Sequence, residues 1–170
     1  MAPIELISRI EKSIPGAVLE RTVFGRTGRT CAWIESRHLR EVAELVAAEG
    51  LDQLEDLSVM HMDGSLVLTY FLASSSLPET LVLRCSKKIA VNIKEVDFDS
   101  VADIWRMAEP LEIESQDLFG AHYLNRAGEP AWPGRHRLAE GWVGFPLRKD
   151  YVFPTEFLGV RHEKRGGLDV

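Results

Sequence analysis

The dipeptide Asp63–Gly64 constrains the fold more than any other feature of the sequence. It separates two runs of alternating apolar and polar residues, Leu57–Met62 and Ser65–Leu72, as the two-residue turn of a β-hairpin requires. Because a turn of this length fixes the strand register, three facing pairs are expected on one side of a sheet: Leu57 with Tyr70, Val59 with Leu68, and His61 with Leu66. His61 is therefore expected to be a buried core histidine rather than a ligand.

Helices and further strands are expected around this hairpin. One helix should start at Pro3 and stop at Pro15–Gly16, and a second should run from an N-cap at Ser36 to Gly50. Their apolar stripes are Ile4, Ile7, Ile10 and Ile14, then Leu39, Val42, Leu45 and Val46. Three further strands are expected: Val18–Phe24, Thr30–Ile34 and Thr80–Ser86. This order predicts an α+β fold, a largely antiparallel or mixed sheet with helices packed on one face.

Composition excludes several classes of protein. The chain has 170 residues, 45% hydrophobic and 27% charged, which suits one globular domain. A net charge of −6 argues against a nucleic-acid partner, because phosphate binding needs a concentrated basic face. Cys31 and Cys85 are far apart and form no Cys-x-x-Cys motif, so no iron–sulfur or zinc site of the usual spacing is expected. We interpret both as small buried hydrophobes in a reduced, cytosolic protein.

The chain divides into three expected parts. Residues 1–99 form the α+β scaffold, in which Lys87–Asp99 is a connector. Residues 100–151 are expected to form a segment of short helices and a docking loop, which begins with a short helix from Ser100 that contains Val101, Ile104 and Trp105. Residues 152–170 lack apolar periodicity and are expected to form an extended, irregular C-terminal arm that orders only against another chain.

Three carboxylates, Glu112, Glu114 and Asp117, stand just before Gly120 and are expected to crowd the first turn of a helix. They could form a general acid–base cluster, since close carboxylates separate their pKa values. Acids in a first turn also favour the positive end of the helix and pair with arginines from elsewhere. The second interpretation is preferred, because no nucleophile, histidine or ligand set stands near them in sequence.

The loop Gly141–Tyr151 is interrupted by Gly and Pro and therefore indicates a contact surface. Its cations Arg148 and Lys149 could bind phosphate or anionic lipid, but are expected to pair across an interface or to fold back onto Asp117. Trp132 and Trp142 are expected to be either interface anchors or core residues of their own domain. His122 and His136 are the candidates for proton transfer, although this role is the less favoured interpretation.

Three blocks of this region together resemble one family. They are Ser100-Val101-Ala102-Asp103-Ile104-Trp105, Glu112-x-Glu114-x-x-Asp117-Leu118-Phe119-Gly120, and Trp142-x-Gly144-x-Pro146-Leu147-Arg148-Lys149-Asp150-Tyr151. Their order and spacing resemble the thirty-kilodalton subunit of respiratory complex I, the C-type or J-type subunit of NADH–quinone oxidoreductases. The run Pro146–Asp150 is the most specific element of the match.

The resemblance implies a non-redox docking subunit in the peripheral arm of a proton-pumping NADH–quinone oxidoreductase, with no catalytic, cofactor-binding or metal residue of its own. It would pack against the forty-nine-kilodalton quinone-pocket subunit and against iron–sulfur subunits, and these partners would carry the FMN, the iron–sulfur clusters and the quinone site. It would lie on the cytoplasmic or organelle-interior side of a membrane, reached only through partners. The residues expected at interfaces are Glu112, Glu114, Asp117, Gly120, Trp142, Gly144, Pro146, Leu147, Arg148, Lys149, Asp150 and Tyr151.

Two alternatives stay open. A homologous subunit of a membrane-bound hydrogenase or a related ion-pumping oxidoreductase would show the same blocks. A freestanding small enzyme would use the acidic turn together with His122, but it would have little use for an irregular arm.

Overall fold

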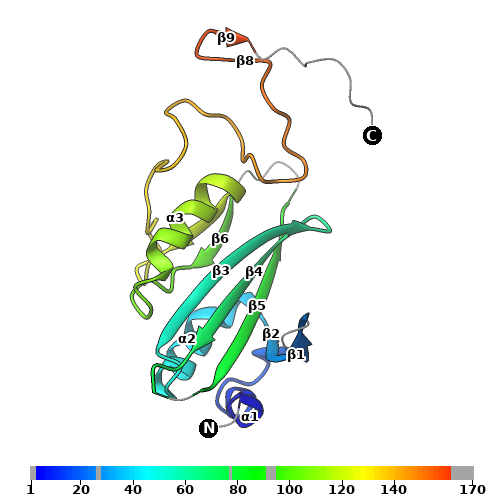
Figure 1. The fold of residues 1–170 in the computed structure, drawn as a ribbon, viewed down its shortest axis with the longest axis vertical. Helices are drawn as coiled ribbons and strands as arrows, with labels where there is room; N and C mark the ends of the chain where they lie inside the picture. Colours follow the sequence, from blue (N-terminus) through cyan, green and yellow to red (C-terminus); the bar gives the residue numbers. More distant parts are fainter. Residues whose placement is uncertain (1–2, 26–27, 77, 91–94, 162–170) are drawn as a thin grey trace.

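A five-stranded mixed sheet forms the body of the molecule (Figure 1). The computed structural model describes residues 3–25, 28–76, 78–90 and 95–161. The strands follow the order β1-β2-β5-β4-β3, and only the β2–β5 pair is parallel. Their bounds are β1 Val18–Phe24, β2 Arg29–Ile34, β3 Gln53–Met62, β4 Ser65–Ala73 and β5 Thr80–Lys88. The predicted α+β fold with a mixed sheet is confirmed.

The β3–β4 hairpin has the predicted turn and register. Asp63 and Gly64 both have positive φ, 49° and 69°, as a type I′ turn requires. Leu57 pairs with Tyr70, Val59 with Leu68, and His61 with Leu66. This register places the apolar set of each strand on the same face of the sheet.

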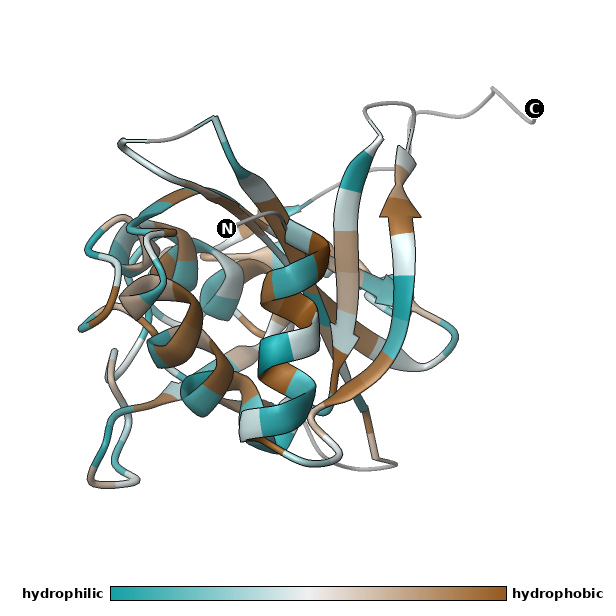
Figure 2. Cartoon of the chain, turned by 90° about the horizontal axis from the view of Figure 1, so that it is seen from below, coloured by the Kyte–Doolittle hydropathy of each residue, from teal (hydrophilic) through white to brown (hydrophobic). Residues whose placement is uncertain are grey.

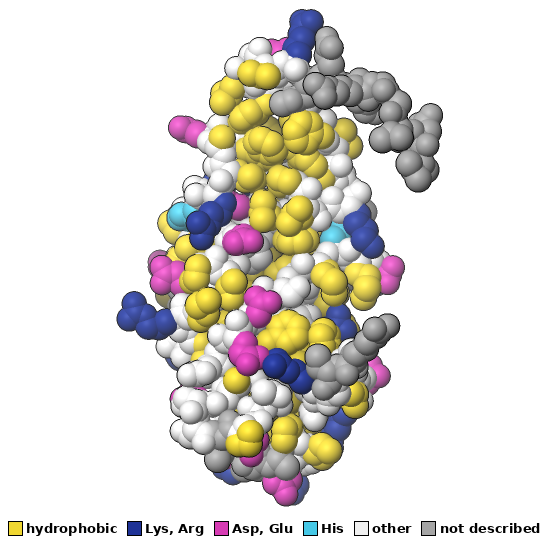
Figure 3. Space-filling view, in the orientation of Figure 1, with side chains coloured by type: hydrophobic (Ala, Val, Ile, Leu, Met, Phe, Trp, Pro, Cys, Tyr) yellow, Lys and Arg dark blue, Asp and Glu magenta, His cyan; other side chains and the backbone are white. Residues whose placement is uncertain are grey.

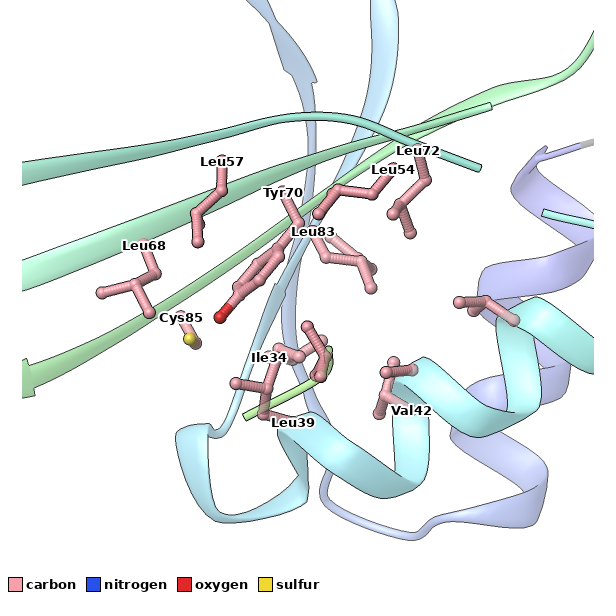
Figure 4. Close-up of a cluster of buried hydrophobic side chains, with 14 of the residues drawn as sticks. Ile34, Leu39, Val42, Leu54, Leu57, Leu68, Tyr70, Leu72, Leu83 and Cys85 are labelled. Carbon is pink, nitrogen blue, oxygen red and sulfur yellow. The ribbon is translucent and has the colours of Figure 1, made fainter. Parts of the chain in front are cut away.

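Two helices cover one end of that face, as predicted. They are α1 Pro3–Ser13 and α2 Leu39–Ala48, and their ribbons alternate between hydrophobic and hydrophilic residues (Figure 2). Leu39 and Val42 of α2 point towards Tyr70 and Leu83 of the sheet, and all four are buried (Figure 4). Ser36 does not cap α2, because it begins a separate 3₁₀ turn, η2 Ser36–His38, and His38 stands at the N-cap position.

The other end of the same face is covered by a small second unit. Strand β6 Val96–Asp99 pairs in parallel with β7 Ala121–Leu124, and α3 Ala108–Phe119 connects them. Phe98 and Tyr123 from this unit belong to the same buried core as the main sheet. The core therefore runs without a break from α1 to β7.

Two predictions for this region are wrong. Lys87–Asp99 is not only a connector, since it contains the end of β5 and all of β6; a strand of four residues is too short to show a clear alternation. Ser100–Met107 forms turns, and the helix begins at Ala108. Pro110 explains the start, because proline lacks an N–H and is tolerated only in a first helical turn.

The segment after β7 is mostly irregular and leads away from the sheet (Figure 1). It ends in a short hairpin of β8 Glu156–Phe157 and β9 Val160–Arg161. Residues 152–161 therefore agree with the predicted arm, and residues 162–170 of that prediction lie outside the described residues. Within the described ranges, no helix combines the length and the apolar character needed to cross a bilayer.

Candidate functional site

Helix α3 gives the three predicted carboxylates different surroundings. Because α3 begins at Ala108, these residues lie in its middle and last turns, and their predicted position in a first turn is wrong. Glu112 and Asp117 are buried at 0% and 1% exposure, whereas Glu114 is exposed. The two buried acids hold the chain around the helix.

Glu112 connects three segments. Its carboxylate accepts hydrogen bonds from Ser100 Oγ at 2.6 Å, from the Val101 amide at 2.8 Å and from Trp132 Nε1 at 2.9 Å. Burial raises the pKa of Glu112, while these three donors act in the opposite direction. Every donor is a structural group of the same chain, so the contacts support the interpretation of Glu112 as a structural residue. They also show that Trp132 is anchored within its own chain.

Asp117 holds the loop that follows Trp132. Its Oδ2 accepts the backbone amides of His136 at 2.9 Å, of Arg137, and of Leu138 at 3.0 Å. An acid in the last turn of a helix is disfavoured by the helix dipole, and three amide donors offset that cost. The predicted pairing of these acids with arginines is wrong, because backbone amides, a hydroxyl and an indole take that place.

Arg148 binds the C-terminal end of α3 rather than Asp117. Its side chain donates to the carbonyls of Phe119 and Gly120, the latter at 3.5 Å, where the helix dipole favours a cation. The guanidinium lies 4.4 Å from the centroid of the Phe145 ring. Arg148 is 8% exposed, and desolvation by burial lowers its pKa below the ordinary value for arginine.

Two glycines of the predicted motif make this packing possible. A Cβ at Gly120 would lie 2.6 Å from Arg148 Nη2 and 2.7 Å from the Phe145 ring, and the φ of +69° also favours glycine. A Cβ at Gly144 would lie 2.9 Å from the ring of Tyr151. Side chains at either position would displace the groups that the loop presents.

The loop Gly141–Tyr151 provides most of the lining of a cavity of about 810 Å³. Its lining includes Arg135, Phe145 and Arg148 together with Trp142 and Tyr151. Arg135 was not among the predicted interface residues; it donates to the carbonyls of Asp117 at 3.0 Å and Gly144 at 2.9 Å, and its guanidinium lies 5.0 Å from the Phe145 centroid. The signals in the sequence were the basic cluster at 135–137 and an aromatic residue between Gly144 and Pro146.

Trp142 packs against the arm. Its ring centroid lies 6.1 Å from that of Phe153 and 4.9 Å from that of Phe157. The space-filling view shows a band of hydrophobic side chains along this part of the molecule (Figure 3). Of the other predicted interface residues, Leu147 is 53% exposed, Lys149 and Asp150 are exposed, and Pro146 is half-buried.

The imidazole rings of the histidines contact neither Glu112 nor Asp117 among the described hydrogen bonds. The side chain of His61 is 10% exposed, in agreement with the predicted buried histidine. Its Nδ1 accepts the Lys149 amide at 3.1 Å and lies 3.6 Å from Asp150 Oδ1, because β3 is an edge strand beside the loop. His122 Nδ1 lies 2.7 Å from Asp97 Oδ1 on β6. His136 is exposed. Across the described part of the chain, no cluster of His, Cys, Asp and Glu could hold a metal ion.

The cysteines match their prediction. Both are buried and free, and burial raises the pKa of each thiol, that of Cys85 to about 12.

Comparison with known proteins gives a consistent result. The family model described as the respiratory-chain NADH dehydrogenase 30 Kd subunit matches residues 32–156. The C/D subunit of the NADH-quinone oxidoreductase of Phocaeicola vulgatus is 32% identical over 138 residues, which are 72% of this chain and 25% of that protein. The J subunit of the NAD(P)H-quinone oxidoreductase from the organellar chromatophore of Paulinella chromatophora is 26% identical over 136 residues, 71% of this chain and 69% of that protein.

The chain spans a quarter of the Phocaeicola protein and 40% of the chloroplastic J subunit of Psilotum nudum, to which it is 37% identical over 68 residues. Two solved structures share the fold. A chain of the membrane-bound sulfane sulfur reductase, an archaeal respiratory membrane complex, has a TM-score of 0.66 at 17% identity and covers 97% of this chain and 98% of that one. The trypsin-resistant fragment of Nqo5 has a TM-score of 0.52 at 21% identity and covers 68% and 92%.

The family model covers most of the chain, including the three sequence blocks and the helix α3 whose C-terminal carbonyls bind Arg148. The chain therefore belongs to the family of the 30 kDa subunit of respiratory-chain NADH dehydrogenase.

Proposed function

We propose that this protein is a docking subunit of a membrane-associated NADH–quinone oxidoreductase, and that it has no redox centre of its own. The single observation that carries the proposal is the distribution of exposed apolar side chains. Of twelve large hydrophobic residues exposed in the described chain, six lie between positions 143 and 160: Val143, Leu147, Val152, Phe153, Leu158 and Val160. A concentration of this kind marks a surface that another protein covers.

The buried polar groups support the same proposal. Glu112 and Asp117 use their carboxylates to hold the chain around α3, and His122 pairs with Asp97 at another place. A freestanding enzyme needs a base, an acid or a nucleophile that converge on one cavity. The side chains of Asp117, Arg135 and Arg148 instead hold the loop that precedes the exposed arm.

The partners follow from the family and stay part of the proposal. We expect contact with the quinone-pocket subunit and with iron–sulfur subunits in the peripheral arm, and we expect FMN, clusters and quinone to be bound by partners. The complex would pump protons, with this subunit on the cytoplasmic or organelle-interior side.

The test separates assembly from turnover. The chain carries an affinity tag in its native host, and complexes are purified from solubilised membranes. We expect electron-input subunits to co-purify with it. Arg148→Ala, or removal of residues 152–170, should lower the amount of assembled complex and leave turnover per assembled complex unchanged. Loss of a desolvated charge contact weakens an interface by roughly 2–5 kcal/mol.

Arg137→Ala is the matched control, because the side chain of Arg137 is exposed and its contact with Asp117 is made by the backbone amide. It should assemble normally. Normal assembly of Arg148→Ala with abolished turnover would contradict the docking role and indicate a direct part in the reaction.

A related subunit of another ion-pumping membrane oxidoreductase is the second candidate. The fold shared with a chain of the archaeal sulfane sulfur reductase along 97% of this chain favours it. The co-purified electron-input subunits distinguish the two candidates.

A further inference from the structure

Strand β3 is an edge of the main sheet, and part of its backbone faces away from its neighbour. In a hairpin with a two-residue turn, the residues that flank the turn exchange both ladder hydrogen bonds, and alternate pairs beyond them exchange none. Counted back from the flanking pair Met62 and Ser65, the pairs of Val59 and Leu57 are of the second kind. The N–H and C=O groups of Val59 and Leu57 therefore point away from β4.

Only one of these four backbone groups has a partner among the described hydrogen bonds. The Leu57 amide donates to Oδ1 of Asp56 at 2.9 Å, which agrees with its outward direction. Within the described chain, no hydrogen bond reaches the N–H of Val59 or the C=O groups of Leu57 and Val59 from outside the sheet. An open row of donors and acceptors is a template for the backbone of another strand.

A groove of about 220 Å³ lies between this part of β3 and helix α3. The two elements lie side by side (Figure 1). The residues of α3 that line the groove share one face of the helix, at spacings of three and four: Leu111, Glu114, Ser115, Leu118 and Phe119. Leu111, Leu118 and Phe119 are half-buried, so a partly open apolar stripe runs beside the free edge.

The groove is acidic. Asp56 and Glu114 are exposed, and the described residues that line the groove include these two acids but no Lys, Arg or His. Neither acid forms an ion pair within the described chain. Charge complementarity therefore favours a cationic residue on whatever occupies the groove.

We propose that an extended segment of a partner subunit adds to the edge of β3, with its backbone bonded to Val59, apolar side chains against α3, and a Lys or Arg near Asp56 and Glu114. The inference rests on the proposed docking function and names the conformation and the chemistry of the partner segment. Leu147 completes the lining of the groove and is one of the exposed apolar residues of the docking loop, so the two surfaces are continuous. In strand addition, main-chain hydrogen bonds give affinity and side-chain pockets give specificity.

Other occupants fit the groove less well. Small-molecule pockets usually enclose about 300–1,000 Å³, which is more than this groove offers. A phosphate or an anionic headgroup would meet two carboxylates. A helix would leave the outward groups of Val59 unpaired, because its own backbone bonds are internal. A second copy of this chain, paired along β3, would bring two acidic grooves together.

Hydrogen exchange at single-residue resolution tests the strand addition. The amides of Ser58 and Met60 face β4 in the register of the hairpin, so they should exchange slowly both in the isolated chain and in complex purified from solubilised membranes. The Val59 amide should exchange at least about tenfold more slowly in the complex than in the isolated chain. An unchanged exchange rate of the Val59 amide would overturn the proposal.

Glu114→Lys tests the charge of the groove. Glu114 is exposed, so the melting temperature of the isolated chain should change little. Wild-type and variant chains with different tags are expressed together in the native host, and the ratio of the tags in purified complex measures relative incorporation. We expect the variant to be about three- to tenfold under-represented, because an attractive contact becomes a repulsive one.

Glu109→Lys is the matched control, because Glu109 is exposed on the same helix and does not line the groove. It should be incorporated as well as the wild type. Equal incorporation of Glu114→Lys and wild type would overturn the proposal.

Cross-linking identifies the occupant. A benzophenone amino acid at Leu147, which lines the groove and is 53% exposed, should attach to a peptide of another subunit that contains Lys or Arg close to the attachment point. Attachment to lipid, to this chain or a second copy of it, to a peptide without a cation, or to no partner would overturn the proposal. If no oxidoreductase subunit co-purifies with the chain, the proposed function itself fails; normal co-purification with unchanged exchange at Val59 refutes only the strand addition.

Discussion

Glu112→Gln tests the hydrogen bonds through which the buried Glu112 carboxylate connects three segments of the second unit. The carboxylate accepts three hydrogen bonds, from Ser100, Val101 and Trp132, whereas an amide offers one acceptor oxygen and adds an N–H donor. If the amide oxygen takes the place that serves Ser100 and Trp132, the Val101 amide faces another donor. One bond to a charged group is lost, about 1.5–3 kcal/mol, and two are weakened by about 1 kcal/mol each.

Removal of the buried negative charge has the opposite effect on stability. Burial raises the pKa of Glu112 above its ordinary value near 4.5, so the fold disfavours the ionised form and a neutral amide recovers part of the loss. We expect a net decrease in the free energy of unfolding of about 2–4 kcal/mol near neutral pH, which is a fall in melting temperature on the order of 10 °C for a domain of this size. Urea denaturation followed by circular dichroism measures the first value.

The pH dependence gives an independent check. A carboxyl whose pKa is higher in the folded chain than in the unfolded chain is protonated more readily when folded, so it contributes stability below the unfolded pKa, and that contribution is lost as pH rises through the folded pKa. The variant lacks this contribution. The difference in unfolding free energy between wild type and Glu112→Gln should therefore widen as pH falls from 7 towards 4.5.

Glu114→Gln is the matched control, because Glu114 is exposed on the same helix. It should change the unfolding free energy by less than about 0.5 kcal/mol. An equal effect of the two substitutions, or a difference that narrows at acid pH, would refute the role assigned to Glu112.

Three further predictions concern the scaffold and the loop. Leu68→Asp places an unpaired charge in the core, at a cost of several kcal/mol, and should abolish cooperative urea unfolding, whereas Met60→Asp on the exposed side of β3 should keep it. Cys31 and Cys85 should resist a thiol reagent in the folded chain and react in urea, because the thiols are buried and the pKa of each is raised; reaction of either thiol at the unfolded rate would contradict their burial. Gly120→Ala should lower the melting temperature through backbone strain of about 1–3 kcal/mol and displacement of neighbouring side chains; an unchanged melting temperature would contradict this packing.

The scaffold was predictable because its signals are local. The dipeptide Asp63–Gly64, which tolerates the positive φ values of a tight turn, and the alternation on both sides of it predicted the hairpin register. Apolar residues at helical spacing predicted α1 and α2. By contrast, β6 contains four residues and pairs with β7 across the whole of α3. Its pairing is a long-range contact, and no periodicity within four residues can indicate it.

The motif residues were predictable but their partners were not. The sequence blocks located Asp117 and Arg148, and charge alone suggested that they pair. The structure gives Asp117 three backbone amides and gives Arg148 two carbonyls at the end of α3. Backbone groups are present at every position, so sequence cannot show which of them will converge on a buried charge. The position of Pro110 was the one local signal that could have placed the helix start correctly.

The C-terminal end of α3 explains how a docking loop can be preformed in the free chain. The carbonyls that end the helix and the ring of Phe145 hold Arg148 in place without an acid, and Asp117 fixes the facing loop through its amides. A partner that covers this loop would therefore meet side chains already held in position, and little conformational entropy of the loop would be lost on binding.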